Sequence, residues 1–387
     1  MLGFVSLFMD VSSELIHSLL PVFMVSSLGA TALVVGLVEG VAEATALIVK
    51  VFSGTLSDYL GKRKALAVFG YGLGAISKPI FALAISVHWV FAARFMDRIG
   101  KGIRGAPRDA LVADLTASQI RGAAYGLRQS LDTVGAVLGP LLGVGLMLLW
   151  AGDFRTVFWF AVIPAVIAVL LLIFGVEEPG AGTVRRNATS PIRWQTLRDL
   201  GRAYWWVVTV GGVFTLARFS EAFLILRAQQ QGLPDTYAPL VLVIMNVVYA
   251  MTAFPMGKLA DRMSHSILLG AGLVVLIVAD LVLARAQGLT MVAIGVALWG
   301  LHMGMTQGLL ATMVADTAPA HLRGTAFGFF NLASGIAMLI ASVLAGLLWD
   351  QLGAAVTFYA GAVFSLLAFM MLALRKTDRS TERHLHR

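Results

Sequence analysis

Ionisable residues recur at helical spacing inside stretches of sequence that are otherwise apolar. Asp10, Glu14 and His17 are separated by four and three residues, so a helix places them within about 60° of one another. Charges within apolar spans cost several kcal/mol unless they face protein, partners or water. Carboxylates beside an imidazole, which titrates near neutrality, suit the binding and transfer of a proton. The spacing therefore predicts an acidic stripe that faces a polar interior.

Three further segments carry charged stripes of the same kind. Glu39, Glu43 and Lys50 form one stripe, and Arg128 and Asp132 share a face with two glycines. The richest stripe lies within about 120° of a helical projection and comprises Arg94, Asp97, Arg98, Lys101, Arg104 and Arg108. Two interpretations follow, namely a solvated cavity with acidic and basic walls, or ion pairs that hold the first half of the chain together. For Glu14 and Arg98 both interpretations stay open. For Arg104, Arg108 and Asp109 we favour the second interpretation, in which the charges form ion pairs within the first half.

The composition places these charges in a membrane protein. Of 387 residues, 58% are apolar and only 13% are charged, and the mean hydropathy is +0.84. A soluble domain has roughly a quarter of its residues charged. Because a membrane helix takes about 20 residues, the chain suits twelve spans with short loops. We therefore expect an all-α integral membrane protein with no room for a separate soluble catalytic domain.

All twelve apolar segments are expected to be helices, because lipid offers no water to bind open backbone groups. The expected spans are 1–25, 32–57, 64–86, 88–112, 122–150, 155–176, 204–228, 237–259, 265–286, 290–314, 323–348 and 354–374. We expect an N-terminal half at 1–176, a cytoplasmic linker at 177–203, a C-terminal half at 204–374 and a basic cytoplasmic tail at 375–387. No cleaved signal peptide is expected, because the first span carries two carboxylates and lacks a basic leading region.

An internal repeat relates the two halves. Val112-Ala113-Asp114 precedes Arg121, and Val314-Ala315-Asp316 precedes Arg323 at the same spacing, so the offset is 202 residues (316 less 114). Two further matches have nearly the same offset, namely Gly54 and Asp58 with Gly257 and Asp261, and Ser13-Glu14 with Ser220-Glu221. The repeat predicts two six-helix halves related by a pseudo-twofold axis along the membrane normal.

The net charge of +8 is distributed in a way that sets topology. Basic residues gather after the second span, in the linker and in the tail, whereas the alternate loops at 26–31, 86–88, 232–236 and 350–353 contain no lysine or arginine. This asymmetry is typical of the positive-inside rule. It predicts a multi-pass protein of the cell inner membrane with both termini cytoplasmic, and it argues against nucleic acid as a partner.

Three motifs carry a family resemblance that covers the whole chain. The segment Gly54-Thr-Leu-Ser-Asp58-Tyr-Leu-Gly61-Lys62-Arg63-Lys64 resembles the signature between helices two and three of the major facilitator superfamily. Residues 135–143, with Gly135, Gly139, Pro140 and Gly143, resemble the glycine-proline motif of its proton-linked exporters. Residues 94–102 resemble a charged variant of its span-four motif. The opening residues 10–14, with 19–21 and 100–104, are similar to a prokaryotic subfamily whose substrates are largely undefined.

The resemblance implies the roles of further residues. In this family helices one, four, seven and ten line the central cavity, which adds residues of the second half to the stripes. The predicted substrate and proton pathway comprises Asp10, Glu14, His17, Glu39, Glu43, Arg94, Asp97, Arg98, Lys101, Arg128, Asp132, Arg218, Glu221, His302 and Gln307. The predicted cytoplasmic latch comprises Gly54, Asp58, Gly61, Lys62, Arg63, Asp114, Arg121, Asp261, Arg262, Asp316 and Arg323.

The expected function is proton-coupled secondary transport of a small solute by alternating access. The glycine-rich span five favours export, hence antiport, and the basic span-four stripe favours an anionic or anion-bearing cargo, such as an organic acid or a metal chelate. The first alternative is multidrug-type efflux of lipophilic cations, with Asp10, Glu14 and Glu221 as counter-charges. The second alternative is uptake of an organic anion.

An enzyme is not expected. The chain has no cysteine, and neither an H-E-x-x-H spacing nor a glycine-rich phosphate loop occurs in it. His384 and His386 in the basic tail are a weak basis for metal binding, so we expect neither a metal nor a cofactor. A monomer is expected, because one chain already encloses a complete pathway between its halves.

Overall fold

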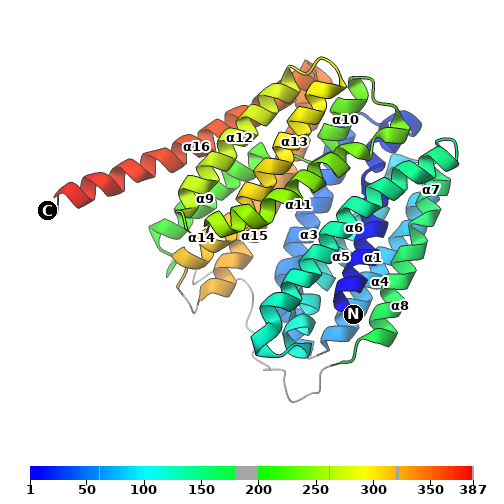
Figure 1. The fold of residues 1–387 in the computed structure, drawn as a ribbon, viewed down its shortest axis with the longest axis horizontal. Helices are drawn as coiled ribbons and strands as arrows, with labels where there is room; N and C mark the ends of the chain where they lie inside the picture. The colour runs from blue at the N-terminus through cyan, green and yellow to red at the C-terminus, as the bar shows by residue number, and fades with distance from the viewer. Residues whose placement is uncertain (61, 179–198, 261, 320–321, 386–387) are drawn as a thin grey trace.

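The computed structural model describes residues 1–60, 62–178, 199–260, 262–319 and 322–385. These residues form helices joined by short turns and contain no strand. Figure 1 shows two bundles of helices that lie side by side. The expected all-α fold with two related six-span halves is confirmed. Most of the predicted linker, residues 179–198, lies outside the described ranges.

The first bundle contains the helices of the first six spans. They are α1 (Leu2–His17), α2 (Leu20–Val22), the π-helix η1 (Phe23–Ser27), α3 (Ala32–Leu60), α4 (Arg63–Ala82), α5 (Val87–Leu115), α6 (Arg121–Leu149), α7 (Phe154–Phe160) and α8 (Val162–Gly175). A single 3-10 turn, η2 (Ser118–Ile120), precedes α6. Span one is thus a helix that is interrupted after His17 and resumes with Pro21 in its first turn, where proline is tolerated.

The second bundle repeats this plan with two interrupted spans. Its helices are α9 (Arg202–Ala217), α10 (Ala222–Gln230), the 3-10 turn η4 (Asp235–Tyr237), α11 (Leu240–Ala260), α12 (His265–Ala284), α13 (Leu289–Thr306), α14 (Leu309–Thr317), α15 (Arg323–Leu352) and α16 (Ala354–Leu385). Span seven breaks at 218–221, and span ten breaks at Gly308, whose φ of +74° suits glycine. Within a membrane such breaks are tolerated where the backbone is buried in protein or lines a cavity.

Within the described ranges, eleven helical segments are long and apolar enough to cross a membrane. The remaining span, α5, contains too many charged residues to be counted among these apolar segments, yet it forms a continuous helix of 29 residues. It packs against α3 and α4, where a Cβ at Gly100 would lie 2.6 Å from the Gly70 carbonyl oxygen. The close glycine contact explains how so polar a helix is accommodated, because its charged face meets protein instead of lipid.

Several expected boundaries need correction, among them the ends of the third and twelfth spans. The helix α4 ends at Ala82 instead of residue 86, three residues after the internal Pro79. The last helix, α16, continues past residue 374 to Leu385, so the backbone of the predicted tail is largely helical. Residues 386–387 lie outside the described ranges, as do the side chains from 375 onward.

The two bundles meet most closely along α3 and α15. At one end, the Asp350 carboxylate of α15 accepts hydrogen bonds from the Ala32 and Leu33 N–H groups at 3.0 and 2.9 Å. Further along, a Cβ at Gly40 would lie 3.2 Å from Leu339 Cα. A helix N-terminus attracts negative charge, so Asp350 ties the beginning of α3 to the opposite bundle. We call this end, where α3 begins and α15 ends, the sealed end.

Candidate functional site

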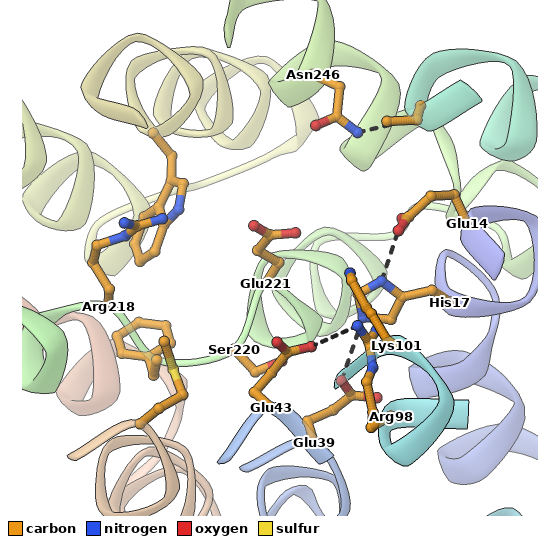
Figure 2. A pocket seen from close by; sticks show the side chains of 14 residues that line it. Glu14, His17, Glu39, Glu43, Arg98, Lys101, Arg218, Ser220, Glu221 and Asn246 are labelled. Carbon is orange, nitrogen blue, oxygen red and sulfur yellow. Dashed lines mark hydrogen bonds and ion pairs between the residues drawn. The ribbon is translucent and has the colours of Figure 1, made fainter. Parts of the chain in front are cut away.

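A cavity of about 310 Å³ lies between the two bundles. Figure 2 shows its lining side chains, which come from α1, α3, α5 and α6 on one side and from 218–221, α11, α13 and α15 on the other. The lining residues are Glu14, His17, Glu39, Glu43, Arg98, Lys101, Ala136, Arg218, Phe219, Ser220, Glu221, Asn246, Trp299 and Met338. Eight of these belong to the predicted pathway, and all eight are ionisable.

An alternating chain of carboxylates and bases runs through the wall of the first bundle. Glu14 Oε2 lies 3.3 Å from His17 Nδ1, and His17 Nε2 lies 3.3 Å from Glu39 Oε2. Glu39 also accepts a hydrogen bond of 2.6 Å from Arg94 Nη2, and both of these side chains are at most 3% exposed. Three helices, α1, α3 and α5, supply the chain. The imidazole is thus held between two carboxylates, with a hydrogen bond to Glu14 and an ion-pair contact with Glu39.

The second stripe residue of α3, Glu43, extends this chain toward the open cavity. Its Oε1 lies 3.3 Å from Arg98 Nη1 and 3.9 Å from Arg94 Nη2. Glu43 is one-third exposed, whereas both arginines are 3% exposed. The α3 and α5 stripes that the sequence predicts therefore face each other. Arg94 and Arg98 each already have a carboxylate partner.

Three other charged lining residues are not paired in this way. Among the described residues, the side chains of Lys101, Arg218 and Glu221 form no hydrogen bond and no ion pair. The Arg218 guanidinium lies over the Phe214 ring, 5.6 Å from its centre. In Figure 2, Glu221 lies between Arg218 on one side and the His17 chain on the other. The cavity thus offers two cations and one carboxylate that are available to a solute.

Five predicted pathway residues of the first bundle do not line the cavity, and four of them are paired behind it. Arg94 lies behind Glu39, and Asp97 binds Lys78 Nζ at 2.8 Å. The same ammonium donates to Ser13 Oγ at 3.0 Å. The other two paired residues, Arg128 and Asp132, bind each other one turn apart on α6. The sequence assigned no role to Lys78, because a single lysine in an apolar span leaves the identity of its partner open.

Asp10 lies at the contact between α1 and α6. A Cβ at Gly135 would lie 3.0 Å from Asp10 Cβ, and one at Gly139 would lie 2.8 Å from the Val11 carbonyl oxygen. Gly135 and Gly139 belong to the glycine-proline motif noted in the sequence. The motif thus lets α6 approach the α1 backbone directly beside Asp10 and Glu14.

The two predicted residues of span ten also lie away from the cavity. His302 is fully buried, and its Nδ1 lies 2.9 Å from the Gly272 carbonyl oxygen of α12. Gln307 ends α13 and is exposed at the break before α14. Span ten instead contributes Trp299, two turns before Gln307.

Several lining residues were missed by the sequence reasoning. Asn246 of α11 donates from Nδ2 to the Ala136 carbonyl oxygen across the bundles at 3.0 Å. A lone amide in an apolar span is a signal that could have found it. Phe219 and Trp299, whose ring centres are 5.4 Å apart, carry no such signal because aromatic residues are common in every span. Within the described ranges, no group of three or more His, Cys, Asp or Glu side chains is arranged to hold a metal ion.

The predicted latch residues lie at the end opposite the sealed end. Arg63 at the start of α4 pairs with Asp114 at the end of α5. In the second bundle, His265 Nδ1 at the start of α12 lies 3.7 Å from Asp316 Oδ2 at the end of α14. Both partners are displaced by 202 residues (265 less 63, and 316 less 114). The two bundles thus repeat one contact at equivalent positions.

The other latch residues take no part in these two pairs. Lys62, Arg262 and Arg323 are exposed, as is Arg121, whose Nε donates to the Thr116 carbonyl oxygen at 3.3 Å. A Cβ at Gly54 would lie 3.5 Å from Ala106 Cβ, so this glycine lies at the α3–α5 contact. Gly61, Asp261 and the side chain of Asp58 lie outside the part of the chain that the structure describes.

Two six-span bundles around a central cavity are the arrangement found in membrane transporters that work by alternating access. The chain belongs to the Major Facilitator Superfamily, whose family model matches residues 2–337 and 218–387. It is 30% identical to an uncharacterized MFS-type transporter of Methanocaldococcus jannaschii over 381 residues, which cover 96% of this chain and 93% of that one. It is 24% identical to the inner membrane transport protein YajR of Escherichia coli, over 90% and 76% of the two chains.

Solved structures show the same fold. A variant of the nucleoside transporter NupG matches with a TM-score of 0.79 at 12% identity, over 96% of this chain and 98% of that one. At this identity the likeness shows the fold alone. The chain is therefore a multi-pass membrane protein of a transporter family, as the sequence motifs predicted.

Proposed function

We propose that this protein is a proton-coupled secondary transporter that exports a small anionic or anion-bearing solute by alternating access. In this proposal it acts as a monomer in the cell inner membrane with both termini cytoplasmic. The sealed end then faces away from the cytoplasm, and the latch residues lie on the cytoplasmic side. The positive-inside distribution of lysine and arginine supports this orientation.

The observation that carries the choice of cargo is the unpaired charge of the cavity. Lys101 and Arg218 face the same space from opposite bundles, and neither is bound to a carboxylate among the described residues. An anionic group placed between them would contact both bundles at once, and a ligand that bridges two moving bodies can change their relative stability. Glu221 would then accept a hydrogen bond from a hydroxyl or amine on the same solute. A carboxylate or phosphate ester with a second polar group fits this arrangement.

The chain from Glu14 through His17 to Glu39 supports proton coupling. This chain begins at Glu14, which lines the cavity, and ends at Arg94, which is buried behind Glu39. A proton that arrives at Glu14 weakens its bond to the imidazole, and the change reaches the α3–α5 contact through Glu39. The chain thereby connects protonation at the cavity to helix packing in the first bundle.

Efflux of lipophilic cations is the alternative that a specific observation favours. Phe219 and Trp299 form an aromatic wall beside Glu221, and aromatic faces attract cations. In that case Glu14 and Glu221 would be the counter-charges, and Lys101 would oppose binding. Uptake of an organic anion shares the cavity chemistry of the main proposal and differs from it only in direction.

Ligand-dependent thermal stability of the detergent-purified protein tests the cargo. A panel of organic anions, metal chelates, sugars and lipophilic cations is compared on wild type, Lys101→Gln, Arg218→Gln and the control Arg155→Gln, which changes an exposed residue at the start of α7. A ligand at 100 times its Kd stabilises by about 2.7 kcal/mol. We expect stabilisation by anions that is lost in both cavity variants and kept in the control. Stabilisation by lipophilic cations that is lost in Glu221→Gln would instead establish the alternative.

Flux into proteoliposomes tests the coupling. We expect Glu14→Gln to abolish transport driven by a pH gradient while counterflow exchange of the same solute continues, because only the proton-binding group is removed. Gln129→Glu, which adds a carboxylate at an exposed position of α6, is the control for a change of charge alone. Undiminished pH-driven flux in Glu14→Gln would remove Glu14 from the proton pathway.

A further inference from the structure

A buried carboxyl group in the second bundle takes no part in the cavity network. Asp280 lies near the end of α12 and is 0% exposed. Neither of its carboxylate oxygens has a hydrogen-bond partner among the described residues. In the first bundle, by contrast, the buried acids Glu39 and Asp97 bind arginine or lysine directly. Asp280 therefore differs in kind from the buried acids of the first bundle.

The space around this carboxyl group is small and borders the cavity wall. A Cβ at Gly361 of α16 would lie 2.7 Å from Asp280 Oδ2 and 3.1 Å from Phe219 Cε1. The missing side chain of Gly361 thus makes room for the carboxyl group, and the Phe219 ring is beside it. Phe219 also lines the cavity and belongs to the non-helical segment between α9 and α10. One aromatic ring therefore lies between Asp280 and the cavity.

No basic group on the neighbouring elements neutralises Asp280. The Arg227 guanidinium of α10 donates instead to the carbonyl oxygens of Leu283, Ala284 and Ala286 at the end of α12. His302 of α13 is bound to the Gly272 carbonyl. The remaining ionisable groups on these elements, up to residue 374, are Arg218, Glu221, His265, Arg285 and Tyr359. His265 pairs with Asp316, and none of the five is paired with Asp280 within the described ranges. An isolated ionised carboxylate in an apolar interior costs far more than the neutral acid.

We propose that Asp280 is a proton-binding site, separate from the Glu14–His17–Glu39 chain, that exchanges its proton with the cavity when Phe219 moves. In the exchange the O–H bond of the acid breaks, the proton passes to water in the cavity, and a carboxylate remains. The ordered Phe219 ring keeps water away from the acid, and movement of segment 218–221 admits it. The site rests on the geometry of α12, α16 and this segment, and it holds whichever solute the cavity transports.

Infrared difference spectroscopy of the full-length protein in lipid tests the site without any transported solute. A protonated carboxylic acid in an apolar setting has a resolved carbonyl band that shifts in D₂O. We expect this band in wild type at neutral pH, its loss in Asp280→Asn, and its retention in Asp153→Asn. Asp153 is an exposed acid that caps α7, and asparagine caps a helix equally well, so this control has the same substitution without the burial.

The rate at which the band shifts after transfer to D₂O tests the role of Phe219. We expect the shift to be at least tenfold faster in Phe219→Ala than in wild type, and unchanged in Phe223→Ala, which removes a neighbouring ring that does not line the cavity. A wild-type spectrum without the band, a band that persists in Asp280→Asn, or equal shift rates in Phe219→Ala and wild type would each overturn the proposal. Because no flux is measured, failure of the transport proposal leaves this result unaffected.

Discussion

The two bundles repeat one fold but treat their charges in opposite ways. The first binds most of its interior charges to one another, as in Arg94 with Glu39, Lys78 with Asp97 and Arg128 with Asp132, although its Lys101 faces the cavity unpaired. In the second, the only ion pair among the described residues is His265 with Asp316, at its outer end. The ionisable groups inside the second bundle face the cavity without an ion-pair partner, bind backbone carbonyls as Arg227 and His302 do, or are buried alone as Asp280 is.

This difference predicts that the two bundles respond differently when a ligand binds, although they share one fold. Buried, mutually satisfied polar networks hold helices in fixed positions, so the first bundle is expected to move as one body. The second bundle has breaks at 218–221 and Gly308, and it contributes Arg218 and Glu221 to the cavity. Ligand-dependent rearrangement is therefore expected mainly in the second bundle. The predictions below test this contrast.

The largest effect is expected from breaking the first bundle's network. Arg94→Leu leaves Glu39 buried at 1% exposure without its shortest partner, and removing one member of a buried pair costs about 3–5 kcal/mol. Chemical denaturation in detergent measures the loss. Arg155→Leu, at an exposed position, should change stability by less than about 0.5 kcal/mol.

The double variant Arg94→Leu with Glu39→Leu sharpens this test. Replacing both members of a buried pair by apolar residues is often neutral, so the double variant should regain part of the lost stability. His17 keeps its bond to Glu14 in this background. If Arg94→Leu alone costs less than about 1 kcal/mol, the first bundle is not held by its ion pairs.

The next effect concerns the glycines that bring α6 against α1. A Cβ at Gly139 would lie 2.8 Å from the Val11 carbonyl oxygen, whereas one at Gly145 on the same helix meets nothing within 4 Å. We expect Gly139→Ala to cost about 1–3 kcal/mol through overpacking. Gly145→Ala should stabilise by about 0.4–1 kcal/mol, because alanine suits a helix better than glycine. Equal stabilities of the two variants would contradict the close α1–α6 contact.

The sequence predicted the spans well because hydropathy and loop composition are local properties. It even placed the charged span four, since six charges on one face of a helix indicate a buried stripe. It could not predict which charges pair, because that depends on how α3, α4 and α5 rotate against one another. Arg94 and Arg98 consequently belonged to the expected anion site, although the structure binds both to α3 carboxylates.

Asp280 and Gln307 show which features a search for helical stripes of charge does not detect. Asp280 is a single acid in an apolar span, so it forms no stripe, although a lone intramembrane charge is itself a functional signal. Gln307 was expected at the cavity because the family resemblance places span ten along it, and that expectation treats the span as one regular helix. The left-handed Gly308 ends that regularity, and the sequence around it contains no proline to announce the break.

A smaller effect is expected at the sealed end, where the bundles share a helix cap. Asp350→Ala removes the acceptor for the Ala32 and Leu33 N–H groups and should cost about 0.5–2 kcal/mol. Because this cap joins the two bundles, its loss should also shift the conformational equilibrium toward opening at this end. Pairs of spin labels report that shift, and the cysteine-free chain accepts introduced cysteines without background labelling.

The control for this cap lies within one bundle. Asp153 caps α7 by accepting from the Arg155 N–H at 3.1 Å, and α3, α15 and the cavity do not depend on it. Asp153→Ala should therefore lower stability by a similar amount and leave the label distances unchanged. Equal shifts in both variants would mean that Asp350 contributes only local helix stability.

The smallest effect on stability is expected at the end opposite the sealed end, where Arg63 pairs with Asp114 and His265 pairs with Asp316. Asp114 is 17% exposed, whereas Asp316 is 62% exposed and its contact with His265 is 3.7 Å long. Exposed ion pairs contribute about 0–1 kcal/mol and are screened by salt. Asp316→Asn should therefore change stability by less than about 0.5 kcal/mol, and Asp114→Asn should cost more, with the difference persisting at high salt. Matching losses would show that the asymmetry between the bundles is confined to their interiors and does not extend to the contact that the repeat preserves.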